Sequence, residues 1–412
     1  MDKVLHRVFT HEKADFGCRF LVIFTVGLSI LRGIRFPSKW ASTQYLLTYD
    51  VGFVRRGFIG ALLKLVFGNV IYQYDFIQSV ILINYILCIA AFIGFSLFLL
   101  RKSNEFLIPL LVFFSSPAFV FFNDVLGYFD QIGFLISSMY IIGYRYLSRL
   151  SYSILYLVII SVLFLTHEGQ VILWGGILSY MLFLKMGGWN FRLQEWFYLA
   201  YVLLITVLTL YVIDLSFLNV TADQMNYIRN EIHRLSNFQI REDYLNWMVG
   251  GSERTRPAMR AYWQSKDAWA FLAKSSAIHL PVFLYFMCAM RYYARSRIRT
   301  IGAYILPVAL ALLPLALHFF GFDTNRWNAY CVISIFMLTI VCMQVAAKTG
   351  DRSVVFRKGS VLLGICVIML NMNSSNYFFD GYQQSFFPYE NHIMFWDDVF
   401  SGREQFPYHP VH

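Results

Sequence analysis

The segment from Thr48 to Gly60, TYDVGFVRRGFIG, places one carboxylate and two guanidinium groups among glycines and phenylalanines. An aspartate such as Asp50 can act as a general base towards a hydroxyl group. Arg55 and Arg56 each present a planar fork of N–H donors that can hold two phosphate oxygens at once. Two plainer interpretations stay open. Asp50 pairs with Arg55 or Arg56 as a structural clamp, or the arginines anchor the loop to lipid headgroups.

A second polar segment, NDVLGYFDQ, carries Asp124 and Asp130 on either side of a glycine. Asp130 enters an apolar helix, where a charged side chain is costly and usually has a function. We predict that both carboxylates contribute to a binding surface together with Tyr128. The alternative for Asp124 is a role as a helix cap.

His167 and Glu168 follow the end of an apolar segment, in the sequence THEG. Such a pair can act as acid and base or can hold a sugar hydroxyl. A zinc site of the HExxH type is excluded, because position 171 lacks the second histidine. The alternative is an ordinary polar pair at the membrane interface.

The segment GFDTNRW adds Asp323, Arg326 and Trp327. Asp323 and Arg326 are three residues apart, a spacing at which side chains on a helix meet. We predict that these three residues bind phosphate or sugar. The alternative is a local salt bridge beside an aromatic residue of the interfacial belt.

A long polar segment, residues 217–267, holds His233, Arg234, Arg241 and the run RTRPAMR. We include Arg234 and Arg241 among the candidate phosphate ligands, although a basic surface facing water or lipid is the plainer interpretation. The six cysteines show no metal-binding spacing and are interpreted as small core residues. The sequence predicts no cofactor and no metal ligand, but leaves dependence on a divalent metal open.

These polar groups stand in a chain that is 58% hydrophobic and 14% charged, with a mean hydropathy of +0.55. A soluble domain is roughly 45–50% apolar and about 25% charged. The composition therefore predicts an all-α membrane protein with many spans. The net charge of +10 is dispersed between the apolar segments. This fits topology signals and contacts with anionic membrane lipid or phosphate, and argues against nucleic acid as a partner.

We predict about eleven transmembrane helices, allowing roughly 17–25 residues for each. The approximate ranges are 16–34, 76–100, 105–122, 129–147, 151–166, 170–186, 197–216, 268–290, 300–320, 328–347 and 359–376. Lys and Arg concentrate in alternate connections, which places those connections and the N-terminus in the cytoplasm. Residues 1–376 then form one transmembrane domain, and residues 377–412 form a periplasmic tail.

Two segments on the predicted outer side, 35–75 and 217–267, break this charge rule. Long loops cross membranes largely regardless of charge, so only the first is a real exception. It favours a functional role for Arg55 and Arg56, or else the predicted topology is wrong at this loop. Residues 58–68 and parts of the long loop are predicted to form amphipathic helices on the membrane surface. We expect the polar groups of five separate segments to converge on this outer side.

The segments YDVGFVRRGFIG, GYFDQIGF, THEG and GFDTNRW, together with this order of spans and loops, resemble the GT-C class of polytopic glycosyltransferases. Within that class the chain is similar to bacterial polymerases and transferases for O-antigen and other surface polysaccharides. The resemblance implies a polyprenyl-linked sugar donor, a saccharide acceptor and inverting transfer at the periplasmic face of the inner membrane. It also implies partners such as a chain-length regulator. Asp50 matches the catalytic loop aspartate of the class.

The resulting prediction is a glycosyltransferase of O-antigen or lipopolysaccharide assembly in which Asp50 deprotonates the acceptor hydroxyl. The residues expected to hold the departing lipid phosphate are Arg55, Arg56 and Arg326. The predicted catalytic set joins Asp50 with Asp130, His167 and Glu168, and these last three are expected to position sugar. Many O-antigen polymerases have arginines in two large outward loops, whereas here only 217–267 is large. Polymerase is favoured, and a single-sugar transferase stays open.

Two further classes of protein stay open as alternatives. A transporter or flippase should show inverted repeats or broken spans with polar groups near the bilayer midplane. An accessory membrane subunit would use the outer polar cluster to bind a partner protein. The polar groups stand at the ends of the predicted helices, which favours the enzyme.

Overall fold

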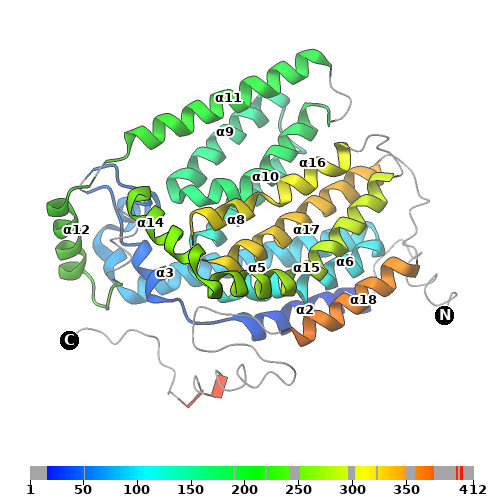
Figure 1. The fold of residues 1–412 in the computed structure, drawn as a ribbon, viewed down its shortest axis with the longest axis horizontal. Coiled ribbons are helices and arrows are strands. Elements are labelled where there is room, and N and C mark those ends of the chain that lie inside the picture. The colour runs from blue at the N-terminus through cyan, green and yellow to red at the C-terminus, as the bar shows by residue number, and fades with distance from the viewer. Residues whose placement is uncertain are drawn as a thin grey trace.

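The computed structural model describes residues 16–50, 52–188, 192–218, 220–241, 251–295, 302–321, 323–348, 358–374, 396–397 and 400–401. Every regular element in these ranges is a helix, and most of the helices run side by side in an elongated bundle (Figure 1). Helices suit a membrane because each satisfies its own backbone hydrogen bonds. The structure is therefore the predicted all-α bundle at this coarse level.

Seven of the helices are long and apolar enough to cross a membrane. They are α2 (Phe16–Gly33), α5 (Tyr74–Lys102), α9 (Arg149–Thr166), α10 (Glu168–Met186), α11 (Leu193–Ser216), α15 (Lys266–Arg295) and α17 (Thr324–Lys348). Each coincides with a predicted span. Their length and composition fit a multi-pass membrane protein.

The span predicted at 105–122 is broken near its middle. It consists of η2 (Asn104–Phe106) and α6 (Leu107–Phe114), followed by α7 (Pro117–Asp124) after a bend of 59°. Ser116 caps α7 by accepting the Phe119 N–H at 3.2 Å. Pro117 stands in the first turn, where its missing N–H leaves no bond unmade. If this bent pair is one span, the described residues contain up to eight.

Polar side chains from two neighbouring helices satisfy the backbone at this break. Ser29 of α2 donates to the Phe114 carbonyl, and Asn371 of α18 donates to the Val112 carbonyl at 3.1 Å and to the Ser115 hydroxyl at 3.0 Å. Arg32 donates to the Ser115 carbonyl at 3.4 Å, and its contact with the Asn371 carbonyl at 3.1 Å ties α2 to α18. An unsatisfied carbonyl inside a membrane costs several kcal/mol, so these contacts stabilise the bend.

Three other predicted spans are helical but short. They are α8 (Phe129–Gly143), α16 (Gly302–Ala311) with η4 (Leu313–Phe319), and α18 (Lys358–Asn373). A single straight span needs about 20 residues. The described helices therefore confirm a helical segment at each predicted position, but not the count of eleven spans.

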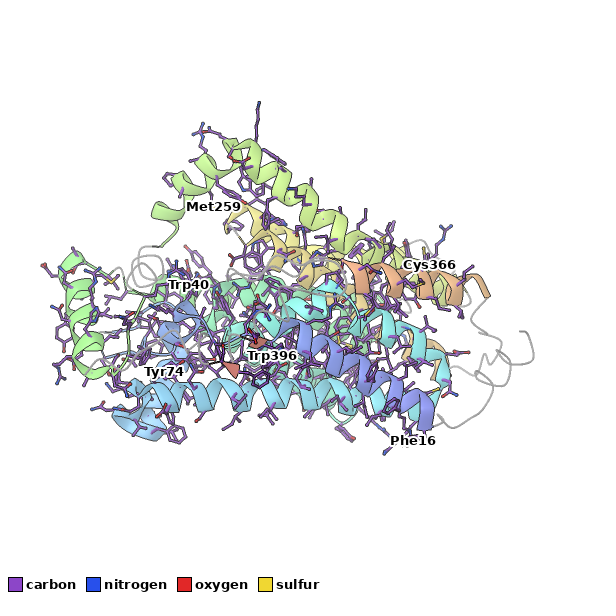
Figure 2. All side chains as sticks on the ribbon, turned by 90° about the horizontal axis from the view of Figure 1, so that it is seen from below. Phe16, Trp40, Tyr74, Met259, Cys366 and Trp396 are labelled. Atoms are coloured by element: carbon purple, nitrogen blue, oxygen red, sulfur yellow. The ribbon has the colours of Figure 1, made fainter. Side chains whose placement is uncertain are left out.

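Short helices gather at the end of the bundle where α5 begins, which we call the loop end (Figure 1). They are α3 (Lys39–Gln44), α4 (Phe58–Phe67), η1 (Gly68–Tyr72), α12 (Ala222–Leu235) and α14 (Gly251–Gln264). Figure 2 shows Trp40 of α3 and Tyr74 of α5 near this end, and Phe16 at the opposite end. The helices predicted within 58–68 and 217–267 are confirmed. The predicted tail at 377–412 lies outside the described residues, apart from 396–397 and 400–401.

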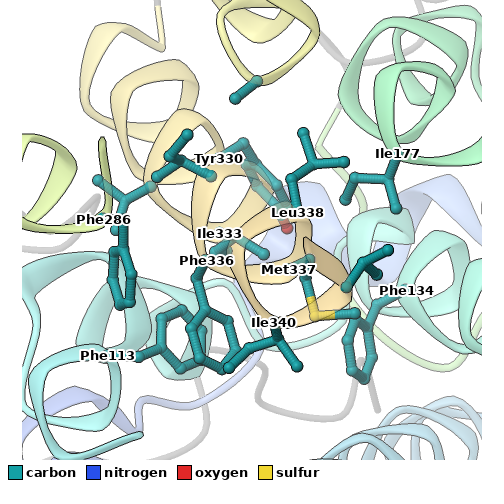
Figure 3. Close-up of a cluster of buried hydrophobic side chains, with 14 of the residues drawn as sticks. Phe113, Phe134, Ile177, Phe286, Tyr330, Ile333, Phe336, Met337, Leu338 and Ile340 are labelled. Atoms are coloured by element: carbon teal, nitrogen blue, oxygen red, sulfur yellow. The ribbon is translucent and has the colours of Figure 1, made fainter. Parts of the chain in front are cut away.

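The central helix of the bundle is α17, whose residues 324–341 are all buried. Phe336 stacks on Phe113 of α6 with ring centroids 3.8 Å apart. Phe134 of α8 and Ile177 of α10 belong to the same cluster (Figure 3). Close-packed side chains leave little room for displacement. The polar residues at the start of α17 therefore stand on a rigid support.

Candidate functional site

The carboxylate of the TYDVGFVRRGFIG loop is held by a lysine of the following surface helix. Lys64 Nζ lies 2.5 Å from Asp50 Oδ2, and the Thr48 hydroxyl donates to the same oxygen at 2.7 Å. Partial burial raises the pKa of Asp50, but the hydrogen bonds from Lys64 and Thr48 outweigh it and lower the pKa below 3.8. The alternative clamp between Asp50 and Arg55 or Arg56 is wrong, because both arginines bind other carboxylates.

Arg55 ties the same loop to the end of α11. Its Nη2 lies 2.7 Å from Asp214 Oδ1, and its guanidinium group lies 4.8 Å from the centre of the Phe217 ring. Phe217 stacks on Phe53, and the Leu218 N–H donates to the Phe53 carbonyl at 2.8 Å. The side chains of Arg55 and Asp214 are both partly exposed. An aromatic stack and an ion pair thus fix the loop against α11.

Arg56 reaches the start of α10 and completes the attachment of the loop. Its Nε donates to Glu168 Oε2 at 3.0 Å and its Nη2 to Oε1 at 2.7 Å, a bidentate pair. The backbone of Arg56 has φ 60°, and no other non-glycine residue in the described part of the chain has a positive φ. This conformation costs about 1–2 kcal/mol for a residue with a Cβ. The Glu168 contacts help to offset that cost, and such strain concentrates at functional sites.

His167 separates α9 from α10 and caps α10. Its Nδ1 accepts the Gly169 N–H at 2.9 Å and lies 3.9 Å from Glu168 Oε2. Burial and the charge of Arg56 lower the pKa of His167 to about 3, although Glu168 and Asp130 act in the opposite direction. The imidazole is therefore neutral at physiological pH. The predicted His167–Glu168 pair is adjacent in space but is not a close hydrogen bond.

A second bidentate ion pair joins the starts of α8 and α17. Arg326 Nε donates to Asp130 Oδ2 at 2.7 Å, and Nη2 donates to Oδ1 at 2.6 Å. Gln170 donates to Asp130 Oδ1 at 2.5 Å, and Trp174 Nε1 donates to Gln170 Oε1 at 2.9 Å. Arg326 also donates to Asp323 at 3.0 Å, so the expected local salt bridge is confirmed as one of several contacts. The Arg326 side chain is 6% exposed, which makes it a buried support.

Aromatic rings enclose the Arg326 guanidinium group. Its centre lies 5.0 Å from the Tyr128 ring centroid and 4.8 Å from that of Trp327. Trp327 is buried, so the alternative of an interfacial belt residue is wrong. Asp124 ends α7, and Tyr128 stands at the N-cap of α8, so Asp124 does not cap that helix. Burial raises the pKa of Tyr128, and the charges of Asp323 and Asp124 act in the same direction.

The two arginines predicted from the long loop are engaged on other elements. Arg234 is exposed on α12 and lies 2.5 Å from Glu231, as the plainer interpretation of a solvated basic surface expects. The Arg241 guanidinium group lies 5.1 Å from the Trp40 ring centroid, and its backbone N–H donates to the Thr43 hydroxyl at 3.0 Å. The predicted polar segments therefore all reach the loop end, but their side chains form several separate ion pairs and not one connected site.

Three helices begin close to the two bidentate pairs. α8, α10 and α17 start at Phe129, Glu168 and Thr324. A helix N-terminus carries a partial positive charge, which stabilises the carboxylates of Asp130 and Glu168 in the first turns of their helices. Arg56, Arg326, Asp130 and Glu168 all affect the pKa of His167. The imidazole therefore lies within electrostatic reach of both pairs.

Sequence reasoning missed Lys64, Asp214 and Gln170, and for the first two it offers little signal. Lys64 has the pattern of an ordinary basic residue on an amphipathic helix, and Asp214 stands at the end of a long apolar span. Gln170 carries the better signal. It stands at the start of an apolar run, and a polar side chain that enters such a run normally has a partner.

Among the described residues, no group of three or more His, Cys, Asp or Glu side chains is placed to hold a metal ion. The chain matches no family model, no curated protein and no solved structure. The functional assignment therefore rests on the charged residues of the loop end and on their surroundings.

Proposed function

We propose that the chain is a membrane-embedded glycosyltransferase that uses a saccharide carried on a polyprenyl phosphate. The observation that carries this proposal is a charged loop beside an exposed apolar helix face. Asp50 pairs with Lys64 of α4, and the same helix exposes Leu65, Val66 and Phe67. Leu65 is 83% exposed, as expected of a helix that lies in a lipid surface. A substrate with a charged head and a lipid tail fits this arrangement, with the head at the charged loop and the tail along the apolar face of α4.

In the proposed reaction Asp50 accepts the proton of the acceptor hydroxyl. The hydroxyl oxygen then bonds to the anomeric carbon, and the bond from that carbon to the phosphate oxygen breaks. The lipid phosphate leaves with the electron pair, and the configuration at the carbon is inverted. Asp50 suits this role because its side chain is 45% exposed and its Oδ1 accepts no hydrogen bond from a described residue. Lys64 and Thr48 orient the carboxylate through Oδ2.

Arg55 and Arg56 are the proposed ligands of the lipid phosphate. Both are partly exposed, and each is held near the loop by a carboxylate that a phosphate could displace. Arginine suits this exchange because its fork fits either anion. Arg326 is buried among carboxylates, so we assign it and Asp130 to positioning the helices rather than to binding phosphate.

We further propose that the loop end faces the periplasm of a bacterial inner membrane, and that the product is a surface polysaccharide. The support is the distribution of basic residues over the short connections between spans, leaving aside the two loop-end segments that break the charge rule. Lys102 ends α5, Arg149 begins α9 and Lys185 lies in the last turn of α10, all away from the loop end. Basic residues favour the cytoplasmic side, so the opposite end of the bundle is the one that faces outward.

Replacing Asp50 with Asn in the native strain tests the enzymatic role. Membrane abundance is checked first, and surface polysaccharide is then separated on a gel. Collapse of a ladder to a single repeat selects a polymerase, whereas an intact ladder of altered mass selects a single-sugar transferase. An unchanged banding pattern at normal abundance removes Asp50 from the mechanism.

A transporter or flippase is a second candidate, because the α6–α7 span is broken inside the bundle. Discontinuous spans form many transporter sites. Here the side chains of Ser29, Arg32 and Asn371 already donate hydrogen bonds to Phe114 and Ser115 at the break. This favours a structural role for the break. Formation of a new glycosidic bond by the purified protein separates the two functions, since a transporter makes none.

A further inference from the structure

The hydrogen bonding of His167 determines which ring nitrogen carries its proton. A neutral imidazole has one N–H donor and one acceptor nitrogen. Nδ1 lies 2.9 Å from the backbone nitrogen of Gly169, whose N–H must donate. Nδ1 is therefore the acceptor, and Nε2 carries the proton.

Burial and two guanidinium groups keep this ring neutral, although charged groups of both signs face it. Arg56 comes from the loop, Glu168 from α10, Asp130 from α8 and Arg326 from α17. The two guanidinium groups and burial oppose a second proton on the ring, and together they outweigh the two carboxylates. The pKa of His167 is lowered to about 3 as a result.

The Nε2–H group has no acceptor among the described residues, since the contacts of His167 all involve Nδ1. The side chain is 18% exposed, so a ligand can reach it. A partly buried N–H group without a protein acceptor can donate to a ligand oxygen, and it stabilises an oxygen that gains negative charge during a reaction.

We infer that the Nε2–H group of His167 donates a hydrogen bond to a phosphate oxygen of the lipid-linked saccharide and does not act as a general acid or base. This inference rests on the proposed transferase function and adds a third phosphate ligand to Arg55 and Arg56. A general base needs a free lone pair, and the only lone pair of this ring is occupied by the Gly169 N–H. A general acid needs a proton that leaves readily, and a neutral imidazole N–H does not supply one.

Two amide variants separate the two nitrogens of the ring. In His167→Asn the side-chain oxygen takes the place of Nδ1 and preserves the cap of α10, but nothing replaces Nε2. In His167→Gln the longer side chain brings an amide N–H close to the position of Nε2, while the cap is weakened. The donor role predicts that Gln supports binding better than Asn. A purely structural role predicts the reverse order.

The test uses the full chain in lipid nanodiscs, with polyprenyl monophosphate as the probe and affinity measured between pH 5 and 8. We expect His167→Gln to bind within about threefold of the wild type, and His167→Asn to bind roughly tenfold more weakly or worse. The ratio of wild-type to His167→Asn affinity should not change with pH, because the ring is neutral throughout.

Two different failures can be told apart. If the wild type does not bind the lipid phosphate, the proposed function fails and the inference fails with it. If the wild type binds and His167→Asn binds equally well, or His167→Gln is as weak as His167→Asn, the donor role alone is overturned. A wild-type affinity advantage that appears only below pH 6 would instead indicate a titrating imidazole and would overturn the donor role as well.

Discussion

Arg326 at the start of α17 binds both carboxylate oxygens of Asp130 at the start of α8, although 196 residues separate them in the chain. Neither side chain is more than 6% exposed. Such a pair adds little net stability, since the loss of hydration offsets the attraction of the charges. Removing one partner is far more harmful, because the other charge stays buried. The pair therefore fixes α8 against α17 and sets the frame on which His167 stands.

Replacing Asp130 with Asn should lower the free energy of unfolding by about 3–5 kcal/mol. The matched control is Asp323→Asn, whose carboxylate is partly exposed and contacts the same arginine. That substitution should cost about 1 kcal/mol or less. Thermal unfolding of the detergent-solubilised variants gives the comparison. A melting temperature of Asp130→Asn equal to that of the wild type contradicts the supporting role of the pair.

Arg56 offers a way to separate backbone strain from side-chain function. Arg56→Gly removes the guanidinium group but relieves the left-handed backbone, whereas Arg56→Ala keeps the backbone cost. The Gly variant should therefore be more stable than the Ala variant by about 1–2 kcal/mol. Both should lose sugar transfer, because neither can hold phosphate. Transfer that recovers in the Gly variant along with stability would show that the guanidinium group only supports the fold.

The pH dependence follows from Asp50, whose pKa is lowered in the folded protein. Such a carboxylate stabilises the fold above its unfolded pKa, and this contribution is lost as the pH falls through the folded pKa. The same carboxylate must be ionised to act as a base, so activity has the same acid limit. Since the ordinary value is 3.8, activity limited by this group should be flat from about pH 5 to 8. Replacing Lys64 with Met removes the partner that lowers the pKa and should move the acid limb to higher pH.

The pH–rate profiles of wild type and Lys64→Met check this expectation, and Lys266→Met is the control lysine on another element. An acid limb that stays in place after loss of Lys64 would remove Asp50 as the titrating base. An equal displacement in Lys266→Met would point to a general charge effect.

The orientation of the bundle can be tested with single cysteines at two exposed arginines. Arg234 lies on α12 at the predicted outer side, and Arg149 begins α9 at the opposite side. A membrane-impermeant thiol reagent added to intact cells should label Arg234→Cys and leave Arg149→Cys unlabelled until the membrane is opened. The reverse pattern would invert the topology and place the charged loop in the cytoplasm.

The helices could be predicted from the sequence because the signal for a span is local. A run of apolar residues of the right length is enough, and α5, α9, α10 and α17 lie within a few residues of their predicted ranges. The break between α6 and α7 is harder to predict, since its flanks are apolar throughout. The triplet Ser115-Ser116-Pro117 holds the available signal, a serine cap followed by proline in the first turn.

The site was predictable only as a set of helix ends that meet on one side. Alternating helices bring residues such as His167 and Arg326 to the same end, whatever their separation in sequence. The pairing of side chains depends on packing, which no local pattern encodes. Asp50 illustrates this. It pairs with Lys64 of α4, whereas the nearby Arg55 and Arg56 pair with carboxylates of α11 and α10.

The most direct measurement is sugar transfer by the purified chain in nanodiscs, from a radiolabelled polyprenyl-phosphate-linked saccharide to a saccharide acceptor. Wild type and Asp50→Asn are compared, and Asp214→Asn, which alters another ion pair of the same loop, is the control. We predict a labelled glycosidic product with wild type, a large part of it retained by Asp214→Asn, and a loss of at least about 100-fold with Asp50→Asn, in line with removal of a general base. Equal transfer by wild type and Asp50→Asn, or no transfer by folded wild-type protein that binds the donor, would contradict the proposal.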